Sequence, residues 1–508
     1  MLVFQRLAQW LLGSKRVRAM WQSDFGWSLI TLLPHPFRQY MKIFYRRVLI
    51  LPKTYPWYVQ TGIERWDSSI PILSVVIPCY NYGRYIRQTL QSFASQTFSD
   101  FETIVVDDGS DEQLTLDVLA ELQKAGIKVL RQKKSNVATA LNLGIGAARG
   151  RYVCCIGADD ILNPTYFEKC LCLLESNLGV GFVYTLVKTF GDENRIWFTE
   201  PFNLRLLLEY NYICAAAVFR KTAWKEVGGF DQKMDGYEDW DFWLRVGKTG
   251  FRGELIPEAL FNYRRHGTTL NLRSDRKYKK LIDHIRANHN DLYSHLDRIA
   301  EVQRSYYDIR VPGPFLNLSS KTQYKNQRET EGVILVASQD TQITQSFWRE
   351  IANKPKLHDA ITVILVAPHH VSIEKEVSTF SPSNQTYHLE RFLDSYCWLD
   401  FVVNLIKTRS ARYVVISNPI PIFEWTTAIS TRTSALVVNL IQDRPELLRL
   451  SAKCDKFIDL HIVFSEHAVR SLIGDFGVQP EKIHSLSGKQ PSAIVHEISK
   501  ILTSYGEK

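Results

Sequence analysis

Short apolar runs alternate with segments of helical periodicity along the middle of the chain. Such runs predict strands, and the first of them is rich in β-branched residues. They lie at 73–77, 103–106, 128–130 and 152–156. Between them, apolar residues recur three or four positions apart, as at Ile86, Leu90 and Phe93, and the segment 138–148 is typical of a further helix. This alternation predicts an α/β fold with a mainly parallel sheet and helices on both faces.

A second α/β region is predicted from Gly332 to the end, with strands at 333–336, 362–366, 413–416, 436–441 and 462–464. Helical spacing predicts one connecting helix within 275–306, and the polar stretch 311–331 is typical of a linker. We therefore expect four parts: a basic amphipathic region over 1–70, an α/β domain over 71–274, a connector and linker over 275–331, and a Rossmann-like domain over 332–508.

Composition sets the N-terminal residues apart from the rest of the chain. The chain has 508 residues, of which 45% are hydrophobic and 23% are charged, as in a folded protein of two or three domains. Of its net charge of +9, residues 1–70 carry +7, and the same residues include five tryptophans. Basic and aromatic residues together favour a lipid surface. The alternative is a helical cap packed on the next domain.

Three further features bear on location. No apolar stretch reaches about 18 residues, so no spanning helix is expected, and the N-terminus lacks the ordered regions of a signal peptide. The eight cysteines form no CxxC pair, which argues against zinc and fits a reducing compartment. We expect a cytoplasmic protein, with peripheral contact at the inner face of the cell membrane left open. Nucleic acid is not an expected partner, because no reading motif occurs.

Polar clusters follow three of the predicted strands. They are Pro78–Asn81, Asp107–Ser110 and Asp159–Asp160. Ligands of open α/β sheets bind at the carboxyl ends of strands, so these clusters mark a candidate site. Each one alone also fits an ordinary turn or helix N-cap, and it is their order along the chain that is specific.

Five segments in that order resemble the motifs of family 2 glycosyltransferases, which have the GT-A fold. They are Ser74–Asn81, Phe101–Ser110, Gly157–Asp160, Val227–Asp231 with Tyr237–Arg245, and Tyr263–His266. The resemblance covers about 200 residues. It implies an inverting enzyme that moves a sugar from a nucleotide-diphosphate donor, with a UDP-sugar as the first guess. The acceptor is a hydroxyl of a glycan or lipid-linked molecule in envelope or exopolysaccharide biosynthesis.

The resemblance also assigns roles to residues. On the donor side it implies Pro78, Tyr80, Asp108 and Asp159, with Tyr80 stacking on the base and Asp108 accepting a hydrogen bond from the base edge. Asp160 is the implied ligand of Mn²⁺ or Mg²⁺, which neutralises the leaving diphosphate. His266 completes the metal or diphosphate shell, or is an ordinary structural histidine.

On the acceptor side, Asp239 stands at the position of the family's catalytic base, and Glu238 and Trp240 flank the acceptor. Trp240 fits a core residue equally well. The chain departs from many members at Gly157, where they have a third carboxylate. That departure keeps open an alternative in which the domain is a non-catalytic, nucleotide-sugar-binding scaffold. A nucleotidyltransferase is ranked low, because no Gly-rich basic loop follows the first strand.

The C-terminal region has a weaker resemblance. The segments 462–467 and 476–483 are similar to the end of the N-terminal half of GT-B glycosyltransferases. We expect an incomplete or accessory Rossmann-like domain there. Ser465 is interpreted as a helix N-cap rather than a nucleophile, and the pair His369–His370 as part of an ordinary loop.

Overall fold

A computed structural model describes much of the chain after residue 69. The described residues are 70–197, 199–267, 277–295, 299, 302–303, 306, 332–337, 361–365, 385–391, 393, 397–409, 411–417, 420–441 and 443–488. The contacts divide the chain into two units, Met1–Asp67 and Ser68–Lys508. The interpretations of residues 1–69, of the linker 311–331 and of His369–His370 lie outside the described residues.

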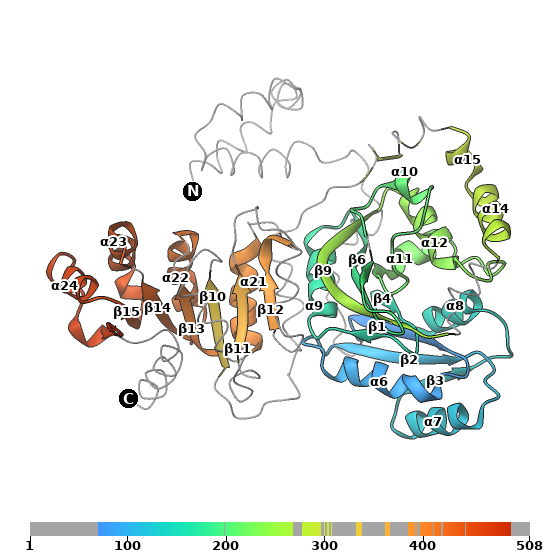
Figure 1. Cartoon of the computed structure of the whole chain (residues 1–508), viewed down its shortest axis with the longest axis horizontal. Helices are drawn as coiled ribbons and strands as arrows, with labels where there is room; N and C mark the ends of the chain where they lie inside the picture. Colours follow the sequence, from blue (N-terminus) through green and yellow to red (C-terminus); the bar gives the residue numbers. More distant parts are fainter. Residues whose placement is uncertain are drawn as a thin grey trace. The chain divides into compact units, whose positions relative to one another are not determined.

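The first sheet begins with the four predicted strands. They are β1 (Leu73–Cys79), β2 (Phe101–Asp107), β3 (Lys128–Arg131) and β4 (Tyr152–Cys155), joined by α6 (Gly83–Ala94), α7 (Gln113–Lys124) and α8 (Val137–Ala147). They pair in parallel in the order β3-β2-β1-β4. The helix α8 packs on β1 and β2, whereas α6 and α7 pack together on the opposite side (Figure 1). The prediction of an α/β fold with a mainly parallel sheet is confirmed.

Beyond β4 the sheet continues with pairings that we did not expect from the sequence. It adds β8 (Val218–Arg220), β6 (Val180–Gly191), β9 (Arg252–Arg265) and β5 (Ile161–Leu162) in that order, and β7 (Ile196–Trp197) pairs with β6. The strand β8 is antiparallel to β4 and to β6, and β5 is antiparallel to β9. The helices of this part are α9 (Tyr166–Ser176), α10 (Leu204–Leu207), α11 (Lys221–Glu226) and α12 (Glu238–Gly247).

The connector is not one helix. Its described residues form α14 (Tyr278–Asn288) and α15 (Asn290–Tyr293), separated at His289. The backbone of His289 leaves the helical region, with φ −119° and ψ 26°. Its side chain is fully buried and lies 3.0 Å from Asp241 through Nε2. A polar tertiary contact therefore interrupts a segment whose apolar periodicity favours a continuous helix.

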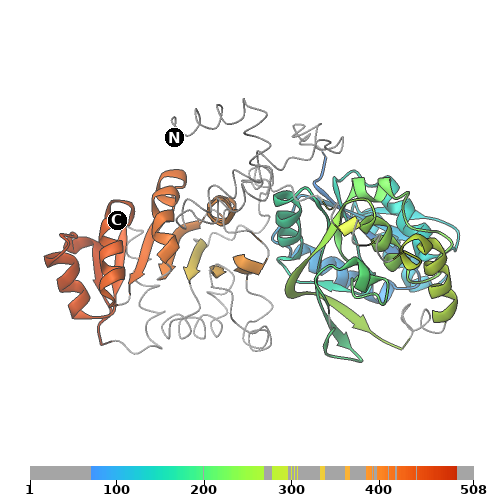
Figure 2. The same ribbon diagram turned by 90° about the horizontal axis from the view of Figure 1, so that it is seen from above.

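The second sheet is parallel throughout its described pairings and has the order β12-β11-β10-β13-β14-β15-β16. Its strands are β10 (Gly332–Ala337), β11 (Ile361–Leu365), β12 (Gln385–His388), β13 (Ala411–Ser417), β14 (Leu436–Ile441), β15 (Leu460–Val463) and β16 (Ile483–Ser485). The helices α21 (Trp398–Thr408), α22 (Ile420–Arg432), α23 (Pro445–Lys453) and α24 (Glu466–Gly474) lie beside it (Figure 2). The prediction of a Rossmann-like α/β fold here is confirmed by the parallel sheet and its strand order, and the GT-B resemblance stays a prediction. Ser465 caps α24 by accepting from Ala468 N, as expected.

A buried ion pair joins α9 to the second sheet. Arg409 Nη2 donates to Glu168 Oε2 at 2.8 Å, and both side chains are less than a tenth exposed. The hydroxyl of Tyr387 also donates to Glu168. Burial acts to raise the pKa of Glu168, but the charge of Arg409 and these hydrogen bonds hold it below its ordinary value.

All eight cysteines are free thiols. In the described part of the chain, no helix combines the length and apolarity needed to cross a bilayer.

Candidate active site

Parallel pairing of β1 with β2 brings the first two polar clusters together. Pro78 is in register with Val106, and Asp108 N donates to Cys79 O at 2.9 Å. Asn81 then turns with a left-handed φ of 59°, a conformation that asparagine adopts more readily than most residues. Its side-chain oxygen accepts from two backbone amides that follow Asp107–Ser110. The two turns therefore form one rigid edge at the carboxyl ends of the strands.

Lys134 lies over the ring predicted to hold the base. Its Nζ is 2.9 Å from the centroid of the Tyr80 ring and 3.4 Å from Asp108 Oδ2. The other oxygen of Asp108 accepts from Gln132 Nε2 at 2.7 Å and from Ser135 N at 2.9 Å. Tyr80 and Asp108 are thus neighbours, but both are engaged by the segment after β3. Our sequence interpretation missed that segment, although it follows a strand at the same edge of the sheet.

The third cluster meets the end of β9. Arg264 N donates to Asp160 Oδ1 at 2.9 Å, and Arg264 Nε donates to Asp159 O at 2.8 Å. The following turn brings His266 Nε2 to 3.0 Å from Asp159 Oδ2. The ring of His266 also stacks on Tyr85 of α6, with 5.2 Å between ring centroids. These contacts arise because β5, directly after Asp160, pairs with β9.

The carboxylates of this cluster have perturbed protonation. Burial raises the pKa of Asp159, against the lowering effect of His266. Burial, followed by the charge of Asp159, raises the pKa of Asp160 well above its usual range. Two buried carboxylates side by side therefore favour a cation between them.

The donor set fits a divalent cation that is bound jointly with a diphosphate. Among the residues that the structure describes, no group of three His, Cys, Asp or Glu side chains is arranged to hold a metal alone. A Cβ built on Gly157, however, would lie 2.8 Å from Asp160 Oδ2 and 2.9 Å from Asp159 Oδ1. Two carboxylate oxygens thus face the same open spot. Mg²⁺ is commonly held by one or two carboxylates together with substrate phosphates and water.

Asp239 and Glu238 occupy the first turn of α12. Tyr237 precedes them as the N-cap of α12. It has a left-handed φ of 55°, which is unusual for a bulky residue, and this turn of the backbone sets where the helix begins. Asp239 is half-buried, and its Oδ2 accepts from Asn211 Nδ2 at 3.3 Å. Burial raises the pKa of Asp239 to about 6. A carboxylate with such a pKa is suited to accept a proton near neutral pH.

Glu238 is the more deeply buried of the two, with 6% of its surface exposed. Its Oε2 has no hydrogen-bond partner among the described residues. Burial and the nearby charge of Asp239 raise the pKa of Glu238 to about 8. The pair therefore titrates in two separated steps. Burial, followed by the negative charge of an ionised Glu238, raises the pKa of Cys155. Cys155 is the last residue of β4, so the start of α12 lies near the end of that strand.

Trp240 is a buried residue. Only 3% of its surface is exposed, and its Nε1 donates to Leu207 O at 2.5 Å. This favours the alternative that Trp240 is part of the core. The hydrogen bond from Trp240 to Leu207 joins the start of α12 to the end of α10.

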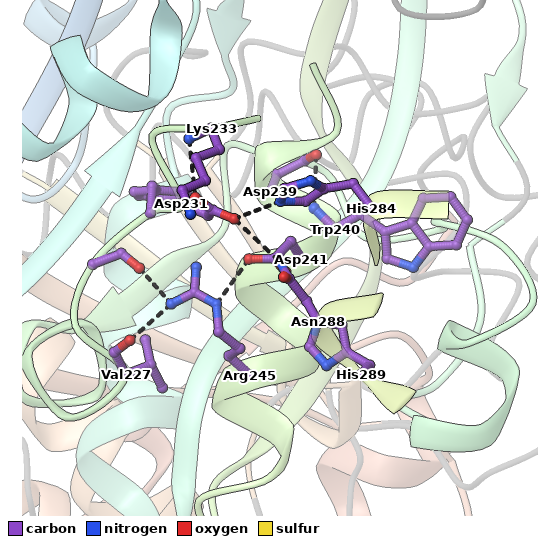
Figure 3. A network of polar contacts seen from close by, with 12 residues as sticks. Val227, Asp231, Lys233, Asp239, Trp240, Asp241, Arg245, His284, Asn288 and His289 are labelled. Atoms are coloured by element: carbon purple, nitrogen blue, oxygen red, sulfur yellow. Dashed lines mark hydrogen bonds and ion pairs between the residues drawn. The ribbon is translucent and has the colours of Figure 1, made fainter. Parts of the chain in front are cut away.

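A polar network holds the segment that carries Asp239 (Figure 3). Arg245 Nη1 donates to the carbonyl oxygens of Val227 at 2.8 Å and Gly229 at 2.5 Å. Its Nε donates to Asp241 Oδ2 at 2.8 Å. Burial acts to raise the pKa of Asp241, but the bond to His289 and the charge of Arg245 hold it below its usual range. Asp241 thus stays ionised and ties the loop before α12 to the helix itself.

The helix α14 completes that network. Asn288 Nδ2 donates to Asp241 Oδ1 at 2.9 Å and to Asp231 Oδ2 at 3.1 Å, so one amide bridges both carboxylates. His284 Nε2 lies 2.9 Å from Asp231 Oδ2. Our sequence interpretation missed these residues of α14, since a polar helix face gave no signal that distinguished it from a solvated one.

Comparison with known proteins agrees with this architecture. Residues 74–228 match the model of the family described as Glycosyl transferase family 2. The chain is 32% identical over 220 residues to an uncharacterized glycosyltransferase from Haemophilus influenzae, covering 39% of this chain and 67% of that protein. It is 31% identical over 207 residues to the amylovoran biosynthesis glycosyltransferase AmsB from Erwinia amylovora, covering 37% and 68%. The chain therefore belongs to glycosyl transferase family 2.

Other similar proteins are longer or more distant. The chain is 27% identical over 236 residues to a chondroitin synthase from Escherichia coli, covering 44% of this chain but only 34% of that protein. It thus spans about a third of that relative's length. Among solved structures it is similar to S. aureus TarS, with a TM-score of 0.36 and 16% identity, covering 57% of this chain and 50% of that one.

Proposed function

We propose that the chain is an inverting glycosyltransferase that uses a nucleotide-diphosphate sugar and acts in envelope or exopolysaccharide biosynthesis. The observation that carries the proposal is Asp239, a half-buried carboxylate with a pKa near 6 at the start of α12. Two relatives named for chondroitin synthesis and amylovoran biosynthesis support a role in building polysaccharides. The acceptor is a hydroxyl of a glycan or of a lipid-linked molecule.

The donor's nucleotide binds along the edge formed by Pro78, Tyr80 and Asp108. If the base stacks on the face of Tyr80 that Lys134 covers, Lys134 has to leave that face, and the same movement frees Asp108 Oδ2. The ammonium group then becomes available to the donor. A UDP-sugar remains the first choice for testing.

The diphosphate binds beside Asp159, Asp160 and His266. A divalent cation bound there supplies charge neutralisation for the leaving diphosphate. Asp160 would hold that cation, with Asp159 beside it, because an oxygen of each carboxylate lies close to Gly157. His266 orients Asp159 through its 3.0 Å contact and joins the metal or diphosphate shell.

Asp239 removes the proton from the acceptor hydroxyl. The acceptor oxygen bonds to the anomeric carbon as the bond from that carbon to the diphosphate oxygen breaks, so attack comes from the opposite face and the configuration inverts. Near neutral pH Asp239 is ionised while Glu238, with the higher pKa, keeps its proton. Glu238 therefore lines the acceptor side as a neutral group and adds no second negative charge.

The test is a donor screen followed by product analysis. Nucleotide sugars with Mn²⁺ are screened for thermal stabilisation of the full chain, because a ligand of the folded state raises the midpoint. Asp160→Asn is expected to lose the stabilisation that depends on Mn²⁺. NMR of the product is expected to show inversion at the anomeric carbon. Retention of configuration would overturn the mechanism, and no stabilisation by any donor would overturn the donor class.

A second candidate is a scaffold that binds a nucleotide sugar without transferring it. Gly157 favours it, because the position lacks a third carboxylate. Donor binding without turnover across many acceptors would support the scaffold. Asp239 argues against it, because a non-catalytic module has no use for a carboxylate of raised pKa.

We also propose that the protein is cytoplasmic and contacts the inner face of the cell membrane peripherally. The support is the charge of +7 and the tryptophans within residues 1–70. Co-sedimentation of the full chain with phosphatidylglycerol vesicles, and its loss at high salt, tests this.

A further inference from the structure

The helix α6 is fastened to the segment that carries Asp159–Asp160. Thr89 Oγ1 donates to Ala158 O at 3.0 Å, directly before the two acids, and Leu162 N donates to Ser92 Oγ at 3.2 Å, shortly after them. Thr89 and Ser92 are both buried, and each bonds to a backbone group. These two contacts therefore serve the ordinary purpose of satisfying buried polar groups where a helix packs on a sheet.

Tyr85 lies one turn earlier on the same face of α6 and makes a different kind of contact. Its ring stacks on the imidazole of His266, with centroids 5.2 Å apart and 30° between the planes. The guanidinium carbon of Arg264 lies 4.9 Å from the centroid of the same ring. Both of these side chains also bind Asp159, His266 through Nε2 and Arg264 through Nε. One ring therefore supports two groups that hold the same acid.

A second ring flanks each of the two supported groups. The ring of Tyr82 lies 5.7 Å from that of His266, at an angle of 57°. The ring of Phe190 lies 4.3 Å from the guanidinium carbon of Arg264. A single hydrogen bond lets an imidazole turn about the line of that bond, whereas a stacked ring also sets the plane of the imidazole. The aromatic rings therefore fix orientations that the bonds to Asp159 leave open.

Filling the core does not account for Tyr85. The core side of α6 is formed by residues such as Ile86 and Phe93, which are 0% and 4% exposed, whereas Tyr85 is only half-buried. The contacts that distinguish Tyr85 are those with His266 and Arg264, which belong to the proposed diphosphate site.

We infer that Tyr85 is a positioning residue, whose ring holds the imidazole of His266 and the guanidinium of Arg264 in place beside Asp159. The inference rests on the proposed function, because that function gives His266 its place at the diphosphate. Tyr85 acts through these two side chains and contacts neither donor nor acceptor. Removal of the ring therefore slows breakage of the bond to the diphosphate more than it weakens recognition of the base.

The first experiment measures how firmly the ring holds His266 in the full chain, without donor or metal. Diethyl pyrocarbonate modifies accessible imidazoles, and peptide mass spectrometry gives the rate at each histidine. In Tyr85→Leu, His266 is expected to react about 3- to 10-fold faster than in the wild type, because a stacked ring pair is lost. Tyr85→Phe keeps the ring and is expected to stay within about twofold of the wild type.

A buried histidine reports whether each variant is folded. The side chain of His289 is fully buried, so it is expected to stay unmodified in every folded variant. If His289 reacts in Tyr85→Leu, the comparison is made with Tyr85→Met, whose flexible side chain fills more of the space of the ring.

The second experiment measures transfer with the donor identified by the thermal screen. Tyr85→Leu is expected to lower kcat about tenfold and to leave donor KM within about threefold, and Tyr85→Phe is expected to restore kcat. In a His266→Ala background, Tyr85→Leu is expected to lower kcat by less than about threefold further, because the ring acts largely through that imidazole. Phe476→Leu, which removes a ring that is 38% exposed after α24, is the matched control and leaves both constants unchanged.

Four results would overturn the inference. They are an unchanged rate of modification of His266 in Tyr85→Leu, an unchanged kcat in that variant, losses in Tyr85→Phe as large as those in Tyr85→Leu, and a full tenfold further loss in the His266→Ala background. If the wild type transfers no sugar from any donor, the proposed function fails, whereas the modification rates still decide whether Tyr85 holds His266.

Discussion

Replacing Glu238 by glutamine should stabilise the protein at alkaline pH. Glu238 is 6% exposed, has one carboxylate oxygen without a partner among the described residues, and has a pKa raised from 4.5 to about 8. A shift of that size corresponds to about 5 kcal/mol between the protonated and ionised forms in the folded state. Glutamine keeps the shape of the protonated carboxyl and cannot ionise, so it removes this penalty.

The direction in which the free energy of unfolding changes with pH follows from proton binding to Glu238. Below about pH 4.5, Glu238 is protonated in both the folded and the unfolded chain, so its contribution to the free energy of unfolding is complete. As pH rises toward 8, the unfolded chain releases this proton while the folded protein keeps it. The free energy of unfolding of the wild type therefore falls, by at most about 1.4 kcal/mol per pH unit. The loss ends once the pH exceeds the folded pKa.

The assay compares thermal midpoints of wild type and Glu238→Gln at pH values from about 5 to 8.5, without donor or metal. The midpoints should nearly coincide at the acidic end. At the alkaline end the variant should melt roughly 5–10 °C higher. Glu121→Gln changes a carboxylate that is 58% exposed and should follow the wild type throughout. A difference in midpoint between Glu238→Gln and wild type that does not grow with pH would show that Glu238 does not keep its proton in the folded protein.

Three further substitutions test the proposed cation site, the buried ion pair of Glu168 and the network around Asp241. Gly157→Ala puts a methyl group 2.8 Å from Asp160 Oδ2. Titration with a nucleotide sugar should therefore show about tenfold weaker donor binding, while the thermal midpoint without donor stays unchanged. Equal donor affinity in the variant and the wild type would contradict this. Arg409→Met leaves Glu168 buried without its charge partner and should cost about 3–5 kcal/mol by calorimetry, part of which the double variant with Glu168→Gln recovers; an unshifted midpoint would contradict it. Asn288→Leu breaks the bridge between two carboxylates and should lower kcat about tenfold with little change in donor KM, whereas a change in KM alone would argue against positioning.

The parts of the fold that sequence predicted well depend on local pattern. The strands β1 and β2 contain short β-branched runs and β4 is a short apolar run, and all three are largely buried in the sheet, so such runs have few alternatives. The polar clusters at their ends follow from parallel pairing. The long strands β6 and β9 were missed. The burial of β9 follows no regular alternation, and the register between β9 and β6 shifts along their pairing, so no simple sequence period marks this pair.

The remaining gaps in the predicted site come from long-range contacts. Lys134 covers Tyr80 from 54 positions along the chain, and no local pattern announces such a contact. Asn288 reaches Asp231 across 57 positions and Asp241 across 47. Each contact depends on the complete fold. Trp240 shows the opposite case, since the sequence left two interpretations open and its burial favours the structural one.

A comparison of wild type with Asp239→Asn tests whether Asp239 is the base of a nucleotide-sugar-dependent transfer. Transfer rate and donor affinity are measured for wild type and Asp239→Asn with the donor identified by the thermal screen. We expect the rate in the wild type to rise with pH through an apparent pKa near 6. We expect the transfer rate to fall about 100-fold or more in Asp239→Asn, with donor affinity retained. Full transfer activity in Asp239→Asn would show that Asp239 is not the base.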